Sequence, residues 1–204
     1  MNNRTLIIIA SILFVGIATN WLIGVTEENA RPDEGPGNEP DLYIEGARIT
    51  QFDSNGQMER RLMADRMTHF PLTDVTTLAV PNVLLYAEAG QGEPWDIIST
   101  QGRLLPQSMF SDEVFELWDQ VLATREDPHG DFVHIQTESL TVFPERDFAA
   151  TDAPVAIDNA RGRTTAGGGM KAWLDSGRFE FFSARDARVV TVLAPGTLKR
   201  EATP

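Results

Sequence analysis

The sequence contains no cysteine among its 204 residues. This absence excludes a disulfide framework and attachment of a lipid through an N-terminal cysteine. Basic residues are also scarce, with 17 Lys and Arg against 30 Asp and Glu and a formal net charge of −13. An acidic chain without basic clusters is poorly suited to nucleic acid or to an anionic membrane surface. The nearest approach to a basic cluster is Arg60, Arg61 and Arg66, which we interpret as solvated strand edges.

Recognisable catalytic and metal-binding motifs are also missing. The chain has three histidines, and the five-residue spacing of His129 and His134 is not accompanied by a second pair of ligands. The carboxylates are scattered, and no serine lies in a G-x-S-x-G turn. Gly167–Gly169 lacks the Lys-Ser/Thr that follows a phosphate-binding loop, so it predicts a turn. We therefore predict no enzyme activity, no catalytic residue, no metal and no cofactor.

Long apolar runs are absent after the first 25 residues. Residues 5–25 read TLIIIASILFVGIATNWLIGV, which as a helix would span roughly 31 Å, about one bilayer hydrocarbon core. Arg4 precedes this run and two glutamates follow it, which places the N-terminus in the cytoplasm. A cleaved signal peptide is the alternative, but no small-x-small site ends the run. We predict a cytoplasmic segment at 1–4 and an uncleaved transmembrane helix at 5–25.

The composition divides the rest of the chain into three parts. Residues 26–40 are rich in Glu, Asp, Pro and Gly and predict an extended acidic linker. Residues 41–194 are long enough for one domain with a real core. Residues 195–204 (PGTLKREATP) predict a disordered tail.

The folded part lacks sustained 3.6-residue periodicity and shows short runs of period-2 alternation instead, which predicts an all-β domain. Asp53–Gly56 contains Asn-Gly and predicts a hairpin turn. Many short strands of even spacing favour a sandwich, barrel or roll. The predicted strands are 42–44, 47–52, 58–64, 76–80, 83–88, 95–100, 113–117, 120–124, 132–137, 139–143, 147–151, 155–159, 169–174, 178–182 and 187–193.

A loose internal repeat runs through these strands. Ile98–Leu104 is similar to Ile135–Thr141, 37 positions later, and Met63–Met67 and Gly168–Leu174 fit the same scheme. One such unit cannot bury its apolar face alone, so neighbouring units must stack. Stacked β units leave open edges at the first and last strands, and these edges invite strand addition by a partner.

The aromatic residues leave two interpretations open. Most of them, such as Phe115, Phe148 and Trp173, fall within or beside predicted strands. They could form an ordinary sheet core, or they could line an apolar trough that receives acyl chains. An open roll allows both, because part of its interior stays available.

The chain resembles a known family in its order of parts and in several local motifs. The motifs are ITQFDSNGQMERRLMA (49–64), VPNVL (80–84), WDIISTQGR (95–103), LWDQV (117–121), 135–141 and 168–171. Together with the short N-terminus, the anchor and the acidic linker, they resemble the LptC family, the inner-membrane-anchored component of lipopolysaccharide export.

The resemblance implies an open, twisted β-jellyroll of repeated antiparallel strands, without catalytic activity, that shields lipopolysaccharide acyl chains. It implies a single-pass protein of the Gram-negative inner membrane whose β domain lies in the periplasm. The partners would be the LptB, LptF and LptG ABC transporter, which supplies the lipid, and LptA, which receives it at the C-terminal edge. A membrane-tethered adaptor that carries no lipid, and an envelope hydrolase without a recognised motif, are the alternative functions.

The resemblance also implies roles for particular residues. Gly56 and Gly162 match glycines of structural or functional importance in the family. The partner edge for LptA would include Phe181, Val190 and Thr191. The interior, lipid-binding positions would be Ala47, Ile49, Leu78, Val83, Phe115, Leu117, Ile135, Phe148 and Phe181.

Overall fold

A computed structural model describes residues 38–86, 93–108, 112–128 and 130–194. Contacts along the chain divide it into two compact units, Met1–Glu39 and Pro40–Pro204. The predicted cytoplasmic segment 1–4, transmembrane helix 5–25 and tail 195–204, with most of the linker, lie outside the described residues. Within the described ranges, no helix is both long and apolar enough to cross a membrane.

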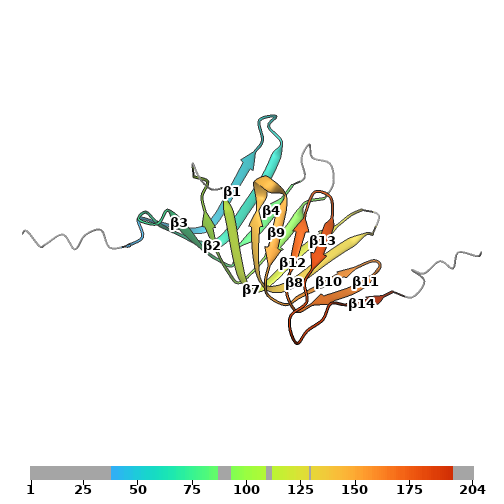
Figure 1. Cartoon of the computed structure of the whole chain (residues 1–204). Coiled ribbons are helices and arrows are strands. Elements are labelled where there is room, and N and C mark those ends of the chain that lie inside the picture. Colours follow the sequence, from blue (N-terminus) through green and yellow to red (C-terminus); the bar gives the residue numbers. More distant parts are fainter. Residues whose placement is uncertain (1–37, 87–92, 109–111, 129, 195–204) are drawn as a thin grey trace, which may run out of the picture. The chain divides into compact units, whose positions relative to one another are not determined.

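The second unit is an antiparallel sheet of 14 strands, as the all-β prediction required (Figure 1). A short 3-10 helix, η2 (Pro144–Arg146), lies between two of them. The strands are β1 (Leu42–Phe52), β2 (Met58–Phe70), β3 (Val75–Ala79), β4 (Asn82–Leu85), β5 (Trp95–Ile98), β6 (Gln101–Leu105), β7 (Val114–Glu126), β8 (Phe132–Phe143), β9 (Phe148–Thr151), β10 (Val155–Asn159), β11 (Gly162–Ala166), β12 (Met170–Trp173), β13 (Arg178–Phe181) and β14 (Val190–Leu193).

The pairing pattern is a simple meander of nine passages of the chain through the sheet. The passages are β1, β2, β3 with β4, β5 with β6, β7, β8, β9 with β10, β11 with β12, and β13 with β14. Each passage pairs with the one before it and the one after it in the sequence. Short connections between neighbours in space need no crossover, which agrees with the absence of long helices from the described residues.

Every passage changes direction near its middle, and this divides the sheet into two layers. Strand β2 shows the division, because Arg66–Phe70 pairs with β3 whereas Arg60–Met63 pairs with β4. The first layer contains β3, β6, β9, β12 and β13, and the second layer contains β4, β5, β10, β11 and β14. Strands β1, β2, β7 and β8 contribute one half to each layer.

Unusual backbone angles mark several of the bends. Gly46, Val80, Asp119, Gln120 and Gly169 have φ values of 60°, 48°, 66°, 59° and 91°, and each lies between the two halves of its passage. Positive φ is sterically costly for residues with a Cβ. In β7 the register with β8 also shifts between Trp118 and Val121. These bends therefore occur at defined residues, where the backbone conformation is unusual.

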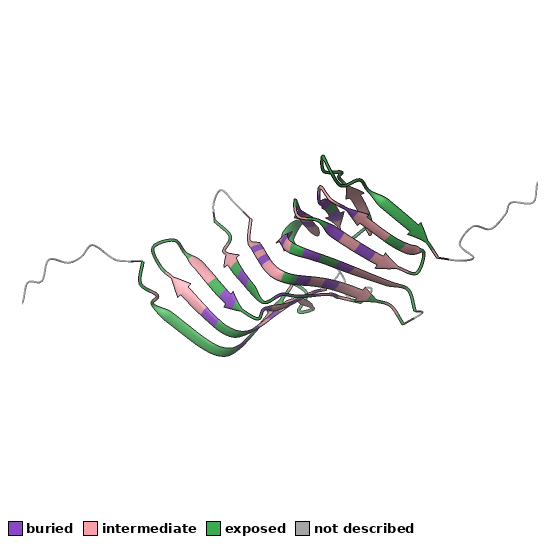
Figure 2. Ribbon diagram, turned by 90° about the horizontal axis from the view of Figure 1, so that it is seen from below, coloured by how far each residue is buried: buried purple, intermediate pink, exposed green. Residues whose placement is uncertain are grey.

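Alternate side chains on each layer are buried, and those of both layers belong to one hydrophobic cluster. The two layers therefore face each other, and Figure 2 shows buried residues alternating along the middle strands. The largest fully buried side chains include Phe115 and Leu117 of the first layer and Ile97 and Ile135 of the second. Each contributes roughly 1.5–3 kcal/mol on burial.

Most predicted strands exist, but their boundaries needed correction. The predicted pairs 113–117 with 120–124 and 132–137 with 139–143 are single bent strands, β7 and β8. Strands β6 and β11 were not predicted at all. The four similar segments of the predicted repeat lie in β2, from the end of β5 into β6, in β8, and around β12. All four belong to passages that run from the second layer to the first, so the repeat unit is two passages.

Candidate functional site

A row of side chains crosses the second layer through all nine passages. Cross-strand pairing sets its members directly opposite one another, and the first seven are apolar while the last two are threonines. In order across the sheet they are Ile49, Leu62, Val83, Ile97, Ala123, Ile135, Ile157, Thr164 and Thr191. Because side chains alternate between faces, directly opposed residues share one face.

The first layer has a matching inner face. One row again crosses all nine passages, and it is formed by Leu42, His69, Thr76, Leu104, Phe115, Val142, Ala149, Ala172 and Phe179. A second row, nearer the bend, begins at Ile44, Met67 and Leu78 and ends at Met170 and Phe181. The two layers thus enclose one continuous, mainly apolar interior.

This interior is closed in the middle and open at its two ends. Val83 and Phe115 are 0% and 1% exposed, whereas Ile49 and Ile44 of the first passage are 46% and 37% exposed. At the other end Thr191 is exposed and Phe181 is half-buried. Figure 2 shows the same gradient, with exposed residues gathered in β1 and β14. The apolar face continues to both ends, where no further strand covers it within the described part of the chain.

The predicted interior residues fall into three groups. Six are buried in the core cluster, and these are Ala47, Leu78, Val83, Phe115, Leu117 and Ile135. Ile49 and Phe181 lie on the same inner faces at the two open ends. The prediction missed their partners across the strands, such as Leu62 and Ile97, because the register of pairing cannot be read from the sequence.

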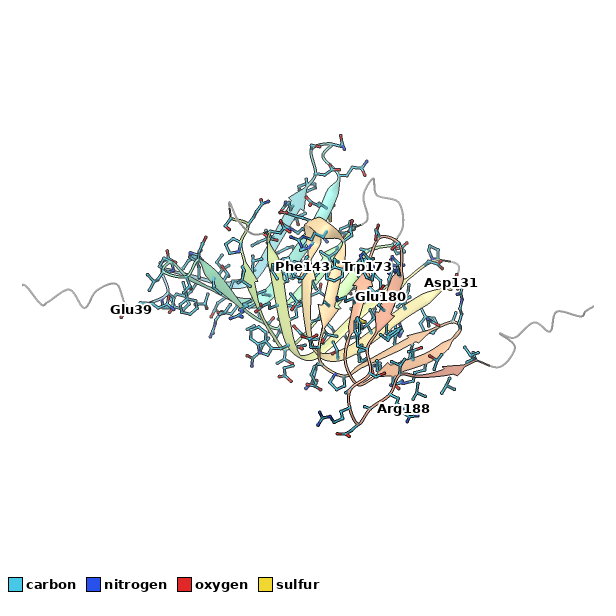
Figure 3. The ribbon with its side chains drawn as sticks, viewed as in Figure 1. Glu39, Asp131, Phe143, Trp173, Glu180 and Arg188 are labelled. Atoms are coloured by element: carbon cyan, nitrogen blue, oxygen red, sulfur yellow. The ribbon has the colours of Figure 1, made fainter. Side chains whose placement is uncertain are left out.

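The placement of Phe148 in the interior was wrong. Ala149 is the buried residue of this strand, and alternation sends Phe148 to the outer face of the first layer. There its ring lies 5.9 Å from that of Phe143 and 5.5 Å from that of Trp173, centroid to centroid. Figure 3 labels Phe143 and Trp173 of this outer cluster. Period-2 alternation places adjacent residues on opposite faces of the sheet, but β9 is too short for its sequence to show which of them faces inward.

One arginine and one glutamate join the two layers across the interior. The Nη1 atom of Arg60, on β2, lies 2.5 Å from Oε1 of Glu113, which directly precedes β7. Their side chains are only 11% and 15% exposed, so the interpretation of Arg60 as a solvated strand edge was wrong. Arg60 also donates from Nε to Oε1 of Gln51 at 2.9 Å. Register explains its burial, because Arg60 lies two residues from Leu62 on the same inner face.

Burial dominates the electrostatics of this pair. It raises the pKa of Glu113, and the nearby Arg60 only partly offsets the effect. Glu145 and Glu59 raise the pKa of Glu113 further. Neither Arg60 Nη1 nor Glu113 Oε1 has a well-aligned hydrogen bond within the described part of the chain, although the two atoms are close. Coulomb attraction is therefore the larger of the contributions by which Arg60 favours the charged form of Glu113.

A second polar contact joins the layers further along the sheet. Trp95 Nε1 on β5 and Arg125 Nη1 on β7 donate to the backbone oxygen of Leu174, at 3.3 Å and 3.0 Å. The Arg125 guanidinium also lies 4.8 Å from the centre of the Trp95 ring. Leu174 directly follows β12 of the first layer, so this contact also spans the interior.

Both predicted glycines have positive φ, for different reasons. Gly56, with φ of 78°, closes the β1–β2 turn by donating to the backbone oxygen of Asp53 at 3.0 Å. The Asp53 carboxylate accepts from the backbone of Gln57 and Asn55, which lowers the pKa of Asp53. Gly162 has φ of 142°, and a Cβ there would lie 2.0 Å from the backbone oxygen of Val192.

The sheet has unpaired edges at both ends within the described residues. Strand β1 pairs with β2 alone, while β13 pairs with β12 and β14 pairs with β11. The predicted edge residues Val190 and Thr191 lie on β14, and Phe181 lies on β13. Val190 is half exposed on the outer face, whereas Thr191 belongs to the inner row.

The described residues offer little for other chemistry. No three His, Asp or Glu side chains among them gather closely enough to hold a metal ion. His134 pairs with Glu126, with Nε2 2.7 Å from Oε1, on neighbouring strands. His129 lies outside the described residues.

Comparison with known proteins agrees with this arrangement. A family model described as "Lipopolysaccharide-assembly, LptC-related" matches residues 6–189. Among curated proteins, none matches the sequence significantly. A similar solved structure is LptH of Pseudomonas aeruginosa, the LptA homologous periplasmic component of the lipopolysaccharide transport device. It has a TM-score of 0.52 at 10% identity, and the match covers 67% of this chain and 95% of that chain.

Proposed function

Because the chain belongs to the LptC-related family of lipopolysaccharide-assembly proteins, we propose that it holds lipopolysaccharide acyl chains between its two layers. One observation carries the proposal, namely that inward-facing rows run through all nine passages and are exposed at both ends. Such an interior would give acyl chains a path from one open end to the other once the two layers separate in the closed middle.

The two unpaired sheet edges support a role in passing lipid from one partner protein to the next. The edge of β1 would meet the LptF subunit of the LptB, LptF and LptG transporter, and the edge of β13 and β14 would meet LptA. Unpaired strands form backbone hydrogen bonds with a partner strand, which would extend the apolar faces into the next protein. In this arrangement the β domain lies in the periplasm and residues 5–25 anchor it in the inner membrane.

The charge of the chain indicates which forces hold the lipid. A net charge of −13 does not attract the phosphates of lipopolysaccharide from a distance. Burial of acyl chains supplies about 0.8 kcal/mol per methylene and needs no charged site. Transport by this route requires no catalysis by the chain itself.

Photo-crosslinking in cells tests the proposal. A photoreactive residue at Ile49, Leu117 or Phe181 should capture lipopolysaccharide, because all three lie on inner faces. Phe148 is the matched control, since it lies on the outer face of the same domain and should capture none. Capture at Phe148 alone, or at none of the four, would contradict a lipid-carrying interior.

A membrane-tethered adaptor is the second candidate, and the unpaired edges at both ends favour it equally. An adaptor would join the transporter to LptA without holding lipid. A photoreactive residue at Thr191 should capture LptA under either function. Capture of LptA there without any capture of lipid at the inner faces would establish the adaptor.

A further inference from the structure

The contact between Arg60 and Glu113 lies where the open end of the interior meets its closed middle. Arg60 pairs with Gln51 on β1, in the passage that also carries the exposed Ile49. Glu113 reaches it from the start of β7 in the first layer. An acyl chain that moves from Ile49 toward Leu62 and Val83 must therefore pass this ion pair.

The space beside the ion pair is too small for such a chain. A cavity of about 60 Å³ lies there, lined on its apolar side by Ile49, Leu62, Val83, Leu104 and Phe115. Gln51, Arg60, Arg61 and Glu113 line its polar side. This volume is that of about two water molecules. The layers must separate at this point before acyl chains can pass, and the ion pair holds them together.

The ion pair is well placed to exchange partners. Both charges are largely removed from water, and their closest atoms are poorly aligned for a hydrogen bond. Desolvation of this kind offsets most of the Coulomb attraction. Burial favours the protonated form of Glu113, which needs no counterion. A buried guanidinium needs an anionic partner, so Arg60 needs another anion whenever Glu113 leaves.

We propose that Arg60 and Glu113 form a latch between the layers, and that the phosphate monoester of an incoming lipid replaces Glu113 on the Arg60 guanidinium. The planar guanidinium binds phosphate through two parallel hydrogen bonds, which its present contact with Glu113 does not provide. Gln51, which already accepts from Arg60 Nε, keeps the guanidinium at the rim of the interior. This inference rests on the proposed lipid-carrying function and adds a headgroup site to it.

Two lipids that differ only in the phosphate test the inference. Full-length protein in detergent micelles would be titrated with phosphatidic acid and with diacylglycerol of the same acyl chains. Wild type should bind phosphatidic acid about tenfold more tightly, as expected for a charge-assisted contact. Arg60→Gln should abolish this preference and retain binding of diacylglycerol.

Three further variants distinguish an effect of the latch from a folding defect and from a change in surface charge. Arg60→Gln leaves Glu113 buried without its counterion, so the double variant Arg60→Gln/Glu113→Gln repeats the test with a neutral pair. Glu113→Gln alone should tighten phosphatidic acid binding, because no carboxylate competes for Arg60. Arg103→Gln is the matched control, since Arg103 forms an exposed ion pair with Glu116 and should not alter the preference.

The outcomes separate the headgroup site from the lipid-carrying function. Equal binding of both lipids by wild type, or an unchanged preference in both Arg60 variants, would overturn the headgroup site and leave the proposed function standing. Binding of neither lipid would overturn the proposed function, and the inference with it.

Discussion

Gly56 and Gly162 differ in what surrounds them, although both have positive φ. An added Cβ at Gly56 meets nothing within 4 Å, whereas at Gly162 it would overlap the backbone of Val192 on β14. Only backbone strain opposes a side chain at Gly56, while strain and direct overlap oppose one at Gly162.

Substitution of the two glycines should separate these effects. Gly56→Ala should lower the free energy of unfolding by about 1 kcal/mol. Gly162→Ala should lower it by more than about 2 kcal/mol, because β14 must move away from β11. Urea unfolding measures both values, and hydrogen exchange at Val192 reports the detachment of β14. Equal losses in the two variants would show that the close approach of β14 is unimportant.

Glu113 should make stability depend on pH. In the folded protein burial raises its pKa above the ordinary value of 4.5, so the folded state binds this proton more readily than the unfolded chain. From 4.5 up to the raised pKa, the free energy of unfolding therefore falls as pH rises.

The variant Glu113→Gln should lose this part of the pH dependence. Urea unfolding of wild type and variant between pH 4.5 and 7 measures it. Glu116→Gln, which removes a nearby outer-face carboxylate, is the control and should keep the wild-type slope. Identical slopes for wild type and Glu113→Gln would contradict the effect assigned to burial.

At the scale of strands, the bends carry strain that a single substitution can relieve. Val80 has φ of 48°, joins β3 to β4 and is 52% exposed. A β-branched residue is strongly disfavoured in this conformation, and the exposed side chain contributes little burial.

Val80→Gly should therefore raise the free energy of unfolding by about 1 kcal/mol, after the added freedom of the unfolded chain is counted. Thermal unfolding measures the change. Val192→Gly is the control, since Val192 is an exposed valine within β14, and that substitution should destabilise. Loss of stability in Val80→Gly would mean that its side chain supports the bend.

The sequence predicted strands where apolar and polar residues alternate, and missed them elsewhere. Strand β11 reads GRTTA and has one buried residue, so nothing in its pattern distinguishes it from a loop. Strand β6 follows β5 after only two residues, and the predicted strand 95–100 ended directly before it. The bend at Val80 could not be predicted from the sequence, because a β-branched residue disfavours the positive φ that it adopts there.

At the scale of the whole domain, the interior should be accessible at its ends and protected in the middle. The native chain has no cysteine, so an introduced cysteine is a unique label site. Ile49→Cys should react with a maleimide within the time that leaves Leu117→Cys unmodified.

Added lipopolysaccharide should slow the labelling of Ile49→Cys several-fold, because acyl chains cover the inner face. Tyr43→Cys, an exposed residue on the same strand, should label at an unchanged rate. Slowing at both positions would indicate general coating of the domain rather than binding between the layers.

The candidate site was predictable as a set of buried apolar residues, but its geometry was not. Leu78, Phe115 and Ile135 are apolar residues in predicted strands, and burial follows from that pattern. The inward position of Arg60 depends on its register with Gln51 and Leu85, and register is a property of paired strands. A charged residue within an apolar row was therefore interpreted as solvent-exposed.

The connectivity of the meander also affects the route by which a bound molecule could leave. Each change of layer occurs inside a passage, so each connection between passages starts and finishes in the same layer. The layers are covalently joined along the bend, because each passage continues there from one layer into the other. The contacts described across the opposite side, at Glu113 and Leu174, are non-covalent. Within the described residues no peptide segment joins the layers on that side, so a long, branched amphiphile held between them would not have to be unthreaded past one.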